Sequence, residues 1–228
     1  MAKRSKKHKE ADDTLVDIVQ VRDSAQDFLE ENQNLVFGIL VGVVLIIGGF
    51  IGYKNFYQKP RNAEAMVQMY QAQFQFERDS FAKALTNPGG GYSGFLDIIN
   101  NYGGTASANS AKYYAGISYL YLGNYNEAID FLKDFSPKGT LTPAMKSGAL
   151  GDAYSELGDY KSAESYYEDA ADAVENDLVT PYYLLKAAMI NEKNADLEAA
   201  SKYLSKIESD YPESNEYNTA VKYLSKLN

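Results

Sequence analysis

An uncharged apolar run near the N-terminus constrains this chain more than any other feature. Residues 35–53 read Leu-Val-Phe-Gly-Ile-Leu-Val-Gly-Val-Val-Leu-Ile-Ile-Gly-Gly-Phe-Ile-Gly-Tyr. A helix of this length reaches roughly 28 Å, close to the roughly 30 Å of a bilayer's hydrocarbon core. A buried helix of a soluble domain would normally have a polar face, and this segment has none. The run therefore predicts a single transmembrane helix in contact with the lipid bilayer.

The flanks of the run favour a retained anchor over a cleaved signal peptide. The positively charged region before the apolar run would be unusually long for a signal peptide, and no Ala-x-Ala-like cleavage site follows Tyr53. Six Lys and Arg precede the run, whereas Lys54, Lys59 and Arg61 follow it closely. The positive-inside rule then places residues 1–34 in the cytoplasm and exports the C-terminal part.

Four glycines gather on one side of the predicted span. At 100° per residue, Gly38, Gly42, Gly49 and Gly52 lie within an arc of about 80°. Such a stripe lets another helix approach closely, either from a second copy or from a different membrane protein. The alternative is that glycine is simply frequent in membrane helices.

The region before the span predicts an amphipathic helix at residues 12–32, preceded by a basic tail from Lys3 to Lys9. The polar face of this helix is acidic, whereas helices that lie on anionic lipid usually carry Lys and Arg there. It therefore suits docking to a protein, or it is merely solvated. The tail can contact lipid headgroups or RNA, although short charge runs are usually solvated.

The composition excludes several classes of function. The chain has no Cys and a single His, His8, which lies in the basic tail, so disulfides, thiolate metal sites and multi-histidine sites are excluded. A formal charge of −9 argues against nucleic acid as the main partner. Because no catalytic constellation of residues is apparent either, we predict a non-enzymatic protein without cofactor or metal.

One glycine motif imitates a nucleotide site. Gly89-Gly90-Gly91-Tyr92-Ser93-Gly94 satisfies the G-x-G-x-x-G pattern of dinucleotide-binding proteins. That fingerprint needs a preceding strand within a βαβ unit, and a helix is expected here instead. We interpret the glycines as a flexible connection between two helices.

The exported part repeats a helical pattern. Small residues at positions 123, 158 and 195 recur at spacings of 35 and 37, near the period of about 34 of tetratricopeptide repeats. In each repeat a small residue of the first helix faces an alanine of the second helix; the pairs are Gly116 with Ala128, Gly151 with Ala163, and Ala188 with Ala200. The predicted fold is all-α: one N-terminal transmembrane helix followed by a tetratricopeptide-repeat α-solenoid.

The ends of this solenoid are less regular. A long helical stretch at 63–85 and a shorter one at 92–101 indicate a degenerate first repeat, and residues 215–227 indicate a C-terminal capping helix. Pro60 suits a helix start. We therefore expect a juxtamembrane linker at 54–61 and a repeat domain at 62–228.

The inner surface of a tetratricopeptide array is supplied mainly by the first helix of each repeat, and the family pattern can be placed on this sequence. The surface it predicts is aromatic, contains Met and is mildly acidic, which suits adaptable contact with apolar segments. Some of these side chains are alternatively expected to pack against a neighbouring repeat. The predicted groove consists of Tyr113, Ile117, Leu120, Tyr121, Met145, Asp152, Glu156, Tyr182, Leu185 and Met189.

The whole chain resembles the membrane-anchored tetratricopeptide proteins that act as ancillary subunits of the bacterial SecYEG translocon. The likeness includes residues 27–32 (Asp-Phe-Leu-Glu-Glu-Asn) and 52–56 (Gly-Tyr-Lys-Asn-Phe). Residues 94–99 (Gly-Phe-Leu-Asp-Ile-Ile), Tyr102, Thr105 and residues 111–116 resemble the version found in Bacteroidota-type bacteria. The resemblance implies a single-pass inner-membrane protein with a periplasmic repeat domain. It further implies association with the translocon, with periplasmic chaperones and with exported polypeptides.

Three functional hypotheses follow from the sequence. The first is a translocon accessory subunit that binds chaperones or emerging chains. The second is a scaffold for envelope assembly unconnected with protein export, and the third is a regulatory binding protein that holds a signalling partner.

Overall fold

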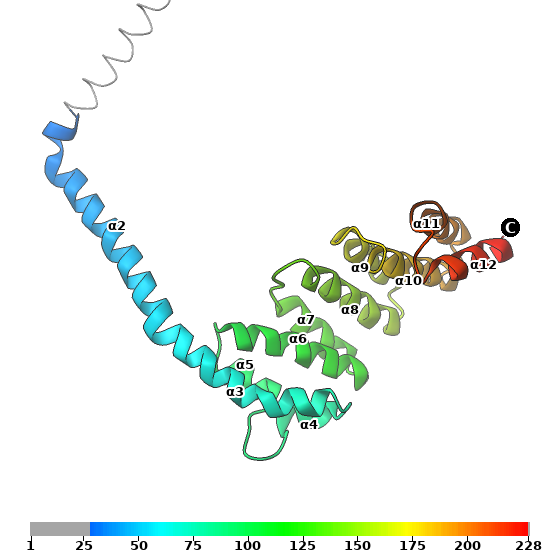
Figure 1. The fold of residues 1–228 in the computed structure, drawn as a ribbon, viewed down its shortest axis with the longest axis horizontal. Helices are drawn as coiled ribbons and strands as arrows, with labels where there is room; N and C mark the ends of the chain where they lie inside the picture. The colour runs from blue at the N-terminus through cyan, green and yellow to red at the C-terminus, as the bar shows by residue number, and fades with distance from the viewer. Residues whose placement is uncertain (1–27, 228) are drawn as a thin grey trace, which may run out of the picture. The chain divides into compact units, whose positions relative to one another are not determined.

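The structure is a computed structural model that describes residues 28–227, and the regular elements within this range are all helices (Figure 1). The chain divides into two compact units, residues 1–57 and residues 58–228. The basic tail and most of the predicted amphipathic helix at 12–32 lie outside the described residues.

The first unit is dominated by the apolar helix α2, Gln33–Tyr53, which contains the predicted span. None of its residues is buried. Leu, Ile, Val and Phe are exposed around it, which is unfavourable in water and suits a hydrocarbon environment. Within the described residues, the helical run Gln33–Phe76 is the one helix long and apolar enough to cross a membrane.

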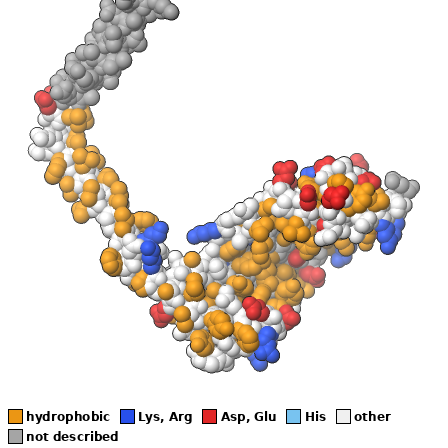
Figure 2. Space-filling model, viewed as in Figure 1, with side chains coloured by type: hydrophobic (Ala, Val, Ile, Leu, Met, Phe, Trp, Pro, Cys, Tyr) orange, Lys and Arg blue, Asp and Glu red, His pale blue; other side chains and the backbone are white. Residues whose placement is uncertain are grey.

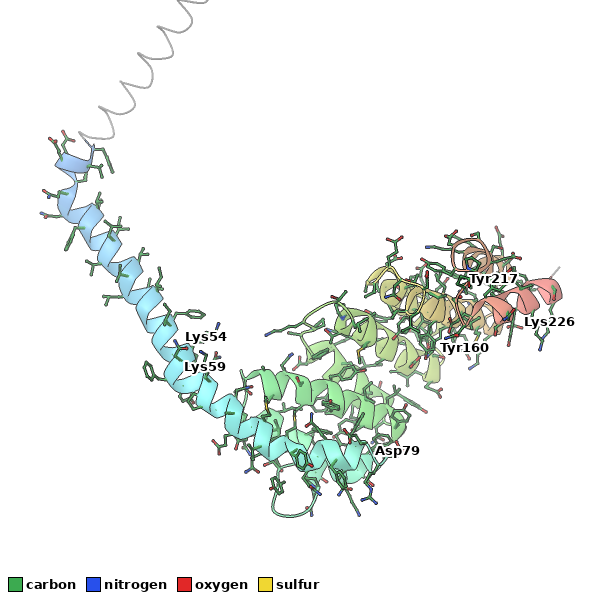
Figure 3. All side chains as sticks on the ribbon, in the orientation of Figure 1. Lys54, Lys59, Asp79, Tyr160, Tyr217 and Lys226 are labelled. Carbon is green, nitrogen blue, oxygen red and sulfur yellow. The ribbon has the colours of Figure 1, made fainter. Side chains whose placement is uncertain are left out.

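The segment expected to be a linker is helical. A π-helical turn, η1 (Lys54–Gln58), follows α2, and helix α3 (Lys59–Phe76) begins directly after it; Lys54 and Lys59 mark the starts of the two segments in Figure 3. Pro60 lies in the first turn of α3. Proline has no N–H to donate to the carbonyl four residues earlier, so the regular α ladder is interrupted at this point. A π-turn accommodates this interruption without ending the helix.

The predicted helix at 63–85 is broken in two. The chain turns at residues 77–80, between α3 and the short helix α4 (Phe81–Thr86), and Asp79 has a φ of 55° there. Aspartate tolerates this left-handed conformation better than most residues, so neither Gly nor Pro marks the turn in the sequence. Helix α5 (Phe95–Asn101) then completes the degenerate first repeat.

The glycine motif connects α4 and α5. Gly89, Gly90 and Gly91 all have positive φ values. A Cβ built on Gly94 would lie 2.4 Å from the Leu85 carbonyl oxygen, so only glycine permits this approach of the two helices. The motif joins two helices, as predicted, and has the packing of a tight interhelical connection.

Three helical hairpins follow, and each helix packs against the next along the chain (Figure 1). They are α6 (Ala106–Tyr121) with α7 (Tyr125–Asp134), α8 (Thr142–Glu156) with α9 (Tyr160–Asp172), and α10 (Thr180–Lys193) with α11 (Leu197–Asp210). Gly123, Gly158 and Ala195, aligned above from the sequence, have φ values of 76°, 77° and 61°. This left-handed conformation ends the first helix of each hairpin.

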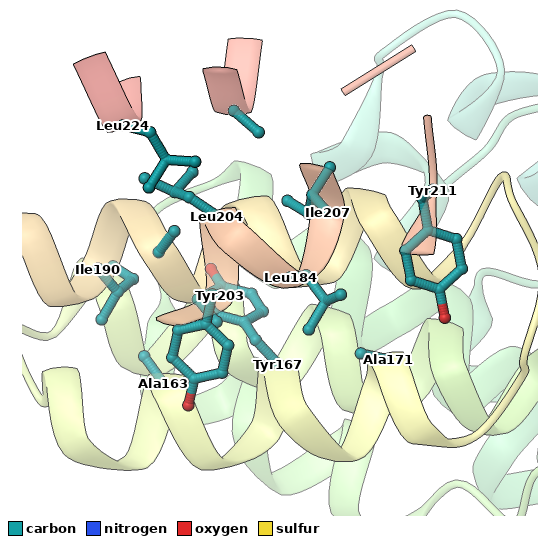
Figure 4. Close-up of a cluster of buried hydrophobic side chains, with 13 residues drawn as sticks. Ala163, Tyr167, Ala171, Leu184, Ile190, Tyr203, Leu204, Ile207, Tyr211 and Leu224 are labelled. Atoms are coloured by element: carbon teal, nitrogen blue, oxygen red, sulfur yellow. The ribbon is translucent and has the colours of Figure 1, made fainter. Parts of the chain in front are cut away.

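The hairpins are tightly packed at the predicted small residues. A Cβ on Gly116 would lie 2.6 Å from the Leu132 side chain, and one on Gly151 would lie 2.6 Å from the ring of Tyr167. The last core cluster includes Leu184, Leu204 and Leu224 (Figure 4). Leu224 comes from α12 (Tyr217–Leu227), which packs on α11 as the predicted terminal helix.

Candidate functional site

The predicted groove residues lie on the first helices of the three hairpins. Helix α6 carries Tyr113, Ile117, Leu120 and Tyr121, helix α8 carries Met145, Asp152 and Glu156, and helix α10 carries Tyr182, Leu185 and Met189. Figure 2 shows hydrophobic side chains gathered over the centre of the repeat region.

Several of these residues meet in one depression of about 430 Å³, which we call the central depression. Leu120, Tyr121, Asp152 and Glu156 belong to the predicted set, and the depression brings them together from two helices. The complete lining is Leu120, Tyr121, Tyr125, Asp152, Ser155, Glu156, Tyr167 and Lys186.

One side of the central depression holds an ion pair. Lys186 Nζ of α10 lies 2.7 Å from Asp152 Oδ1 of α8, and the Tyr167 hydroxyl donates a 2.7 Å hydrogen bond to the same oxygen. Burial opposes the charge of Lys186, but the Asp152 carboxylate outweighs it and raises the pKa of the lysine. The pair therefore links α8 to α10 with the lysine charged.

Tyrosine rings surround this lysine. Its Nζ lies 5.5 Å from the ring centroid of Tyr167 and 5.1 Å from that of Tyr182. These distances are within the range of cation–π attraction. Burial and the nearby Asp152 carboxylate raise the pKa of Tyr167, which therefore stays a neutral hydrogen-bond donor.

The other side of the central depression is more open. Tyr121 is 69% exposed and stacks on Phe81 of α4, with ring centroids 4.7 Å apart and planes 3° apart. The Tyr125 hydroxyl donates a 3.3 Å hydrogen bond to Glu156 Oε2. Aromatic rings and a carboxylate are thus presented to solvent from three helices.

A second depression, of about 190 Å³, lies between α6 and α8. Tyr113 and Met145, both predicted groove residues, line it together with Ser110, Tyr114, Phe135 and Thr142. The Tyr113 ring centroid is 5.3 Å from that of Phe135, and burial raises the pKa of Tyr113 to about 12.

The remaining predicted residues differ in accessibility. Ile117 packs against the cluster that contains Leu132 and Leu150, and Leu185 packs against the C-terminal core cluster. Tyr182 and Met189 stay exposed on α10. On α2, a Cβ built on Gly38, Gly42, Gly49 or Gly52 meets no atom of the described residues within 4 Å.

Five residues near this surface were not predicted from the sequence: Phe81, Tyr125, Tyr167, Tyr183 and Lys186. Tyr183 packs where a Cβ of Gly148 would stand, 2.2 Å from its ring. Gly148 lies on α8, the first helix of its hairpin, three residues after Met145. A glycine at such a position leaves space for a side chain of another helix, and this was the sequence signal that could have indicated Tyr183. No sequence signal indicated Phe81, because the turn that positions α4 was not predicted.

The chemistry of this surface favours binding. Rings, a thioether and a few charged groups form contacts with side chains and peptide groups of a partner. Within residues 28–227, no three His, Asp or Glu side chains are arranged to hold a metal ion.

Comparison with protein-family models identifies the hairpins. Tetratricopeptide-repeat models match residues 110–136, 148–176 and 182–214. The matched segments correspond to α6–α7, α8–α9 and α10–α11, so the predicted repeats are confirmed. The chain therefore contains tetratricopeptide repeats, which are modules for protein–protein interaction. No curated protein matches the chain.

Proposed function

We propose that this protein is a non-enzymatic accessory subunit of the bacterial Sec translocon, anchored in the inner membrane by α2. Its N-terminus is cytoplasmic, and its periplasmic repeat domain binds chaperones or emerging polypeptides. The observation that carries the binding role is the exposed Tyr and Met surface on α6, α8 and α10, which includes Tyr121, Met145 and Met189. The link to the translocon is supported by the resemblance of the sequence to ancillary SecYEG subunits.

The binding surface suits polypeptides of varied sequence. Tyrosine gives a large contact area with few rotatable bonds, and methionine adapts its shape to different apolar side chains. Phe81 holds the ring of Tyr121 by stacking while most of that ring stays exposed. Part of the surface is therefore preorganised before a partner arrives.

The anchor supports association inside the membrane. The four stripe glycines leave a groove on α2 that no atom of residues 28–227 fills. Small residues at this spacing let a second helix approach closely in lipid. We assign this groove to a helix of the translocon.

The test is purification of the full-length protein from native membranes in mild detergent, followed by mass spectrometry of stoichiometric companions. Recovery of the translocon core with a chaperone is the expected result. Recovery of a different envelope complex would contradict the export role and favour the scaffold or the regulatory protein.

A variant pair sharpens this test. Gly42→Leu with Gly49→Leu should release the translocon, because leucine fills the groove, while the repeat domain stays folded. Val36→Leu with Val43→Leu has the same seven-residue spacing on another side of the helix, and it should keep the companions. Equal retention by both pairs would contradict the glycine-stripe mechanism.

A further inference from the structure

On α6, α8 and α10, the lysines have partners within the protein, whereas one glutamate has no cationic partner in the described part of the chain. All four lysines of these helices have a partner: Lys112 contacts Asp134, Lys146 donates to the carbonyls of Lys133 and Phe135, Lys186 contacts Asp152, and Lys193 lies over the ring of Tyr160. Glu156 differs. Among the described residues, its one recorded contact is the Tyr125 hydroxyl at 3.3 Å, and no cation pairs with it.

The protein itself shows how this surface accommodates a basic side chain. Lys186 is held by one carboxylate, Asp152, at 2.7 Å and by two tyrosine rings, those of Tyr167 and Tyr182, within 5.5 Å. A carboxylate supplies the counter-charge, and the rings present their negative faces to the ammonium group.

The same set of groups occurs again on the other side of the central depression. Glu156 supplies a carboxylate, and Tyr121 and Tyr125 supply two rings, all three lining the space that Lys186 borders. Stacking on Phe81 fixes one face of the Tyr121 ring, and 69% exposure leaves most of the side chain accessible. This second set contains no basic side chain of its own.

We propose that the central depression receives a lysine or arginine side chain from the bound polypeptide. The cation lies against Tyr121 and Tyr125 and faces Glu156, while flanking apolar residues contact the neighbouring Tyr and Met side chains. This inference rests on the proposed polypeptide-binding function and adds a preference for basic residues.

The net charge of the part that we propose is exported also favours a basic partner. Residues 54–228 contain 16 Lys and Arg and 23 Asp and Glu, which gives a net charge of −7. An acidic domain attracts basic segments over several ångströms, and this attraction weakens with added salt.

The test uses the full-length protein in lipid nanodiscs and fluorescent nonapeptides of the form Ser-Leu-Phe-Ser-X-Ser-Phe-Leu-Ser, in which X is Lys, Arg, Gln or Glu. Fluorescence anisotropy at low and high salt gives each dissociation constant. The Lys and Arg peptides should bind about fivefold more tightly than the Gln peptide, and the Glu peptide should bind most weakly.

Matched variants locate the effect. Glu156→Gln should remove most of the preference for Lys over Gln, and Glu208→Gln, which changes an exposed carboxylate on α11, should keep it. Tyr121→Leu should weaken the Lys and Arg peptides more than the Gln peptide. Unchanged melting temperatures show that each variant is folded.

The outcomes separate this inference from the proposed function. Equal affinity for the Lys and Gln peptides, or equal effects of Glu156→Gln and Glu208→Gln, would overturn the preference while leaving polypeptide binding intact. Failure of every peptide to bind would overturn both.

Discussion

Glycines occupy helices in both units of the molecule, but their surroundings differ completely. In the repeat unit, a Cβ on Gly116, Gly148 or Gly151 would lie between 2.2 and 2.6 Å from a side chain of the neighbouring helix. In α2, a Cβ on Gly42 or Gly49 would meet nothing within 4 Å in the part of the chain that the structure describes.

The difference shows where each glycine's partner lies. In the hairpins, the space left by the missing side chain is filled by Leu132, Tyr183 and Tyr167 of the chain itself. In α2 the equivalent space is open, although glycine lowers helix stability relative to alanine by up to about 1 kcal/mol. We infer that the repeat glycines serve folding and that the anchor glycines serve association.

Among the substitutions, the largest expected effect is that of Gly151→Ala. The added Cβ would overlap the ring of Tyr167, which is 3% exposed and hydrogen-bonded to Asp152, so the ring has little room to move. We expect a loss of about 2 kcal/mol in the free energy of unfolding, after allowing for the higher helix propensity of alanine. Thermal unfolding followed by circular dichroism measures it.

The matched control is Gly42→Ala in α2. Because Gly42 belongs to the first unit and takes no part in the core clusters of the repeats, the melting of the repeat domain should not change. A similar loss in both variants would break the comparison, since it would mean that close packing does not distinguish the two sets of glycines.

Alkaline pH should destabilise the repeat unit. Burial raises the pKa of Tyr113 to about 12, whereas an unfolded tyrosine titrates near 10. The folded state therefore holds more protons between pH 10 and 12, so its stability is complete below pH 10 and falls as the pH rises. The expected slope is about 1.4 kcal/mol per pH unit for each such tyrosine.

This prediction also separates the two units. Residues 33–52 of α2 contain no titratable side chain, and all 20 tyrosines except Tyr53 and Tyr57 lie after Gln58. Denaturant unfolding at a series of pH values measures the slope. Tyr113→Phe should make it shallower, and an unchanged slope would show that this hydroxyl is not protected by folding.

Gly148→Ala should have a smaller effect than Gly151→Ala. The atoms nearest to the added Cβ belong to the outer end of the Tyr183 ring, which is only partly buried and can swing aside. We expect a loss of about 1 kcal/mol, together with altered peptide binding. A loss as large as that of Gly151→Ala would mean that Tyr183 is as rigidly held as Tyr167.

The smallest effect concerns backbone conformation. Ala195 has a φ of 61° at the position that glycine occupies in the two preceding hairpins. Ala195→Gly should therefore stabilise the protein by up to about 1 kcal/mol, and Gly158→Ala should destabilise it by a similar amount. Chemical denaturation of the two variants measures both changes, and effects of the same sign would contradict this explanation.

The repeats were predictable because their signals are local. Gly116, Gly151 and the turn positions 123, 158 and 195 recur at a nearly fixed period, and each has a packing or backbone role in the structure. The turn at Asp79 was not predictable, because a non-glycine residue adopts the left-handed conformation there.

The site was only partly predictable. The repeat pattern selected Leu120, Tyr121, Asp152 and Glu156, which line one depression. It did not select Lys186, whose contact with Asp152 joins residues 34 positions apart and depends on how two repeats stack. It also selected Ile117 and Leu185, which pack largely against core clusters.

Site-specific photo-crosslinking in intact cells tests the central claim most directly. A photoreactive amino acid replaces Tyr121 in the central depression or Glu208 on α11, and mass spectrometry identifies the crosslinked proteins. The account predicts crosslinks from position 121 to exported polypeptides or a chaperone, with little product from position 208. Equal products from both positions, or none from position 121, would contradict it.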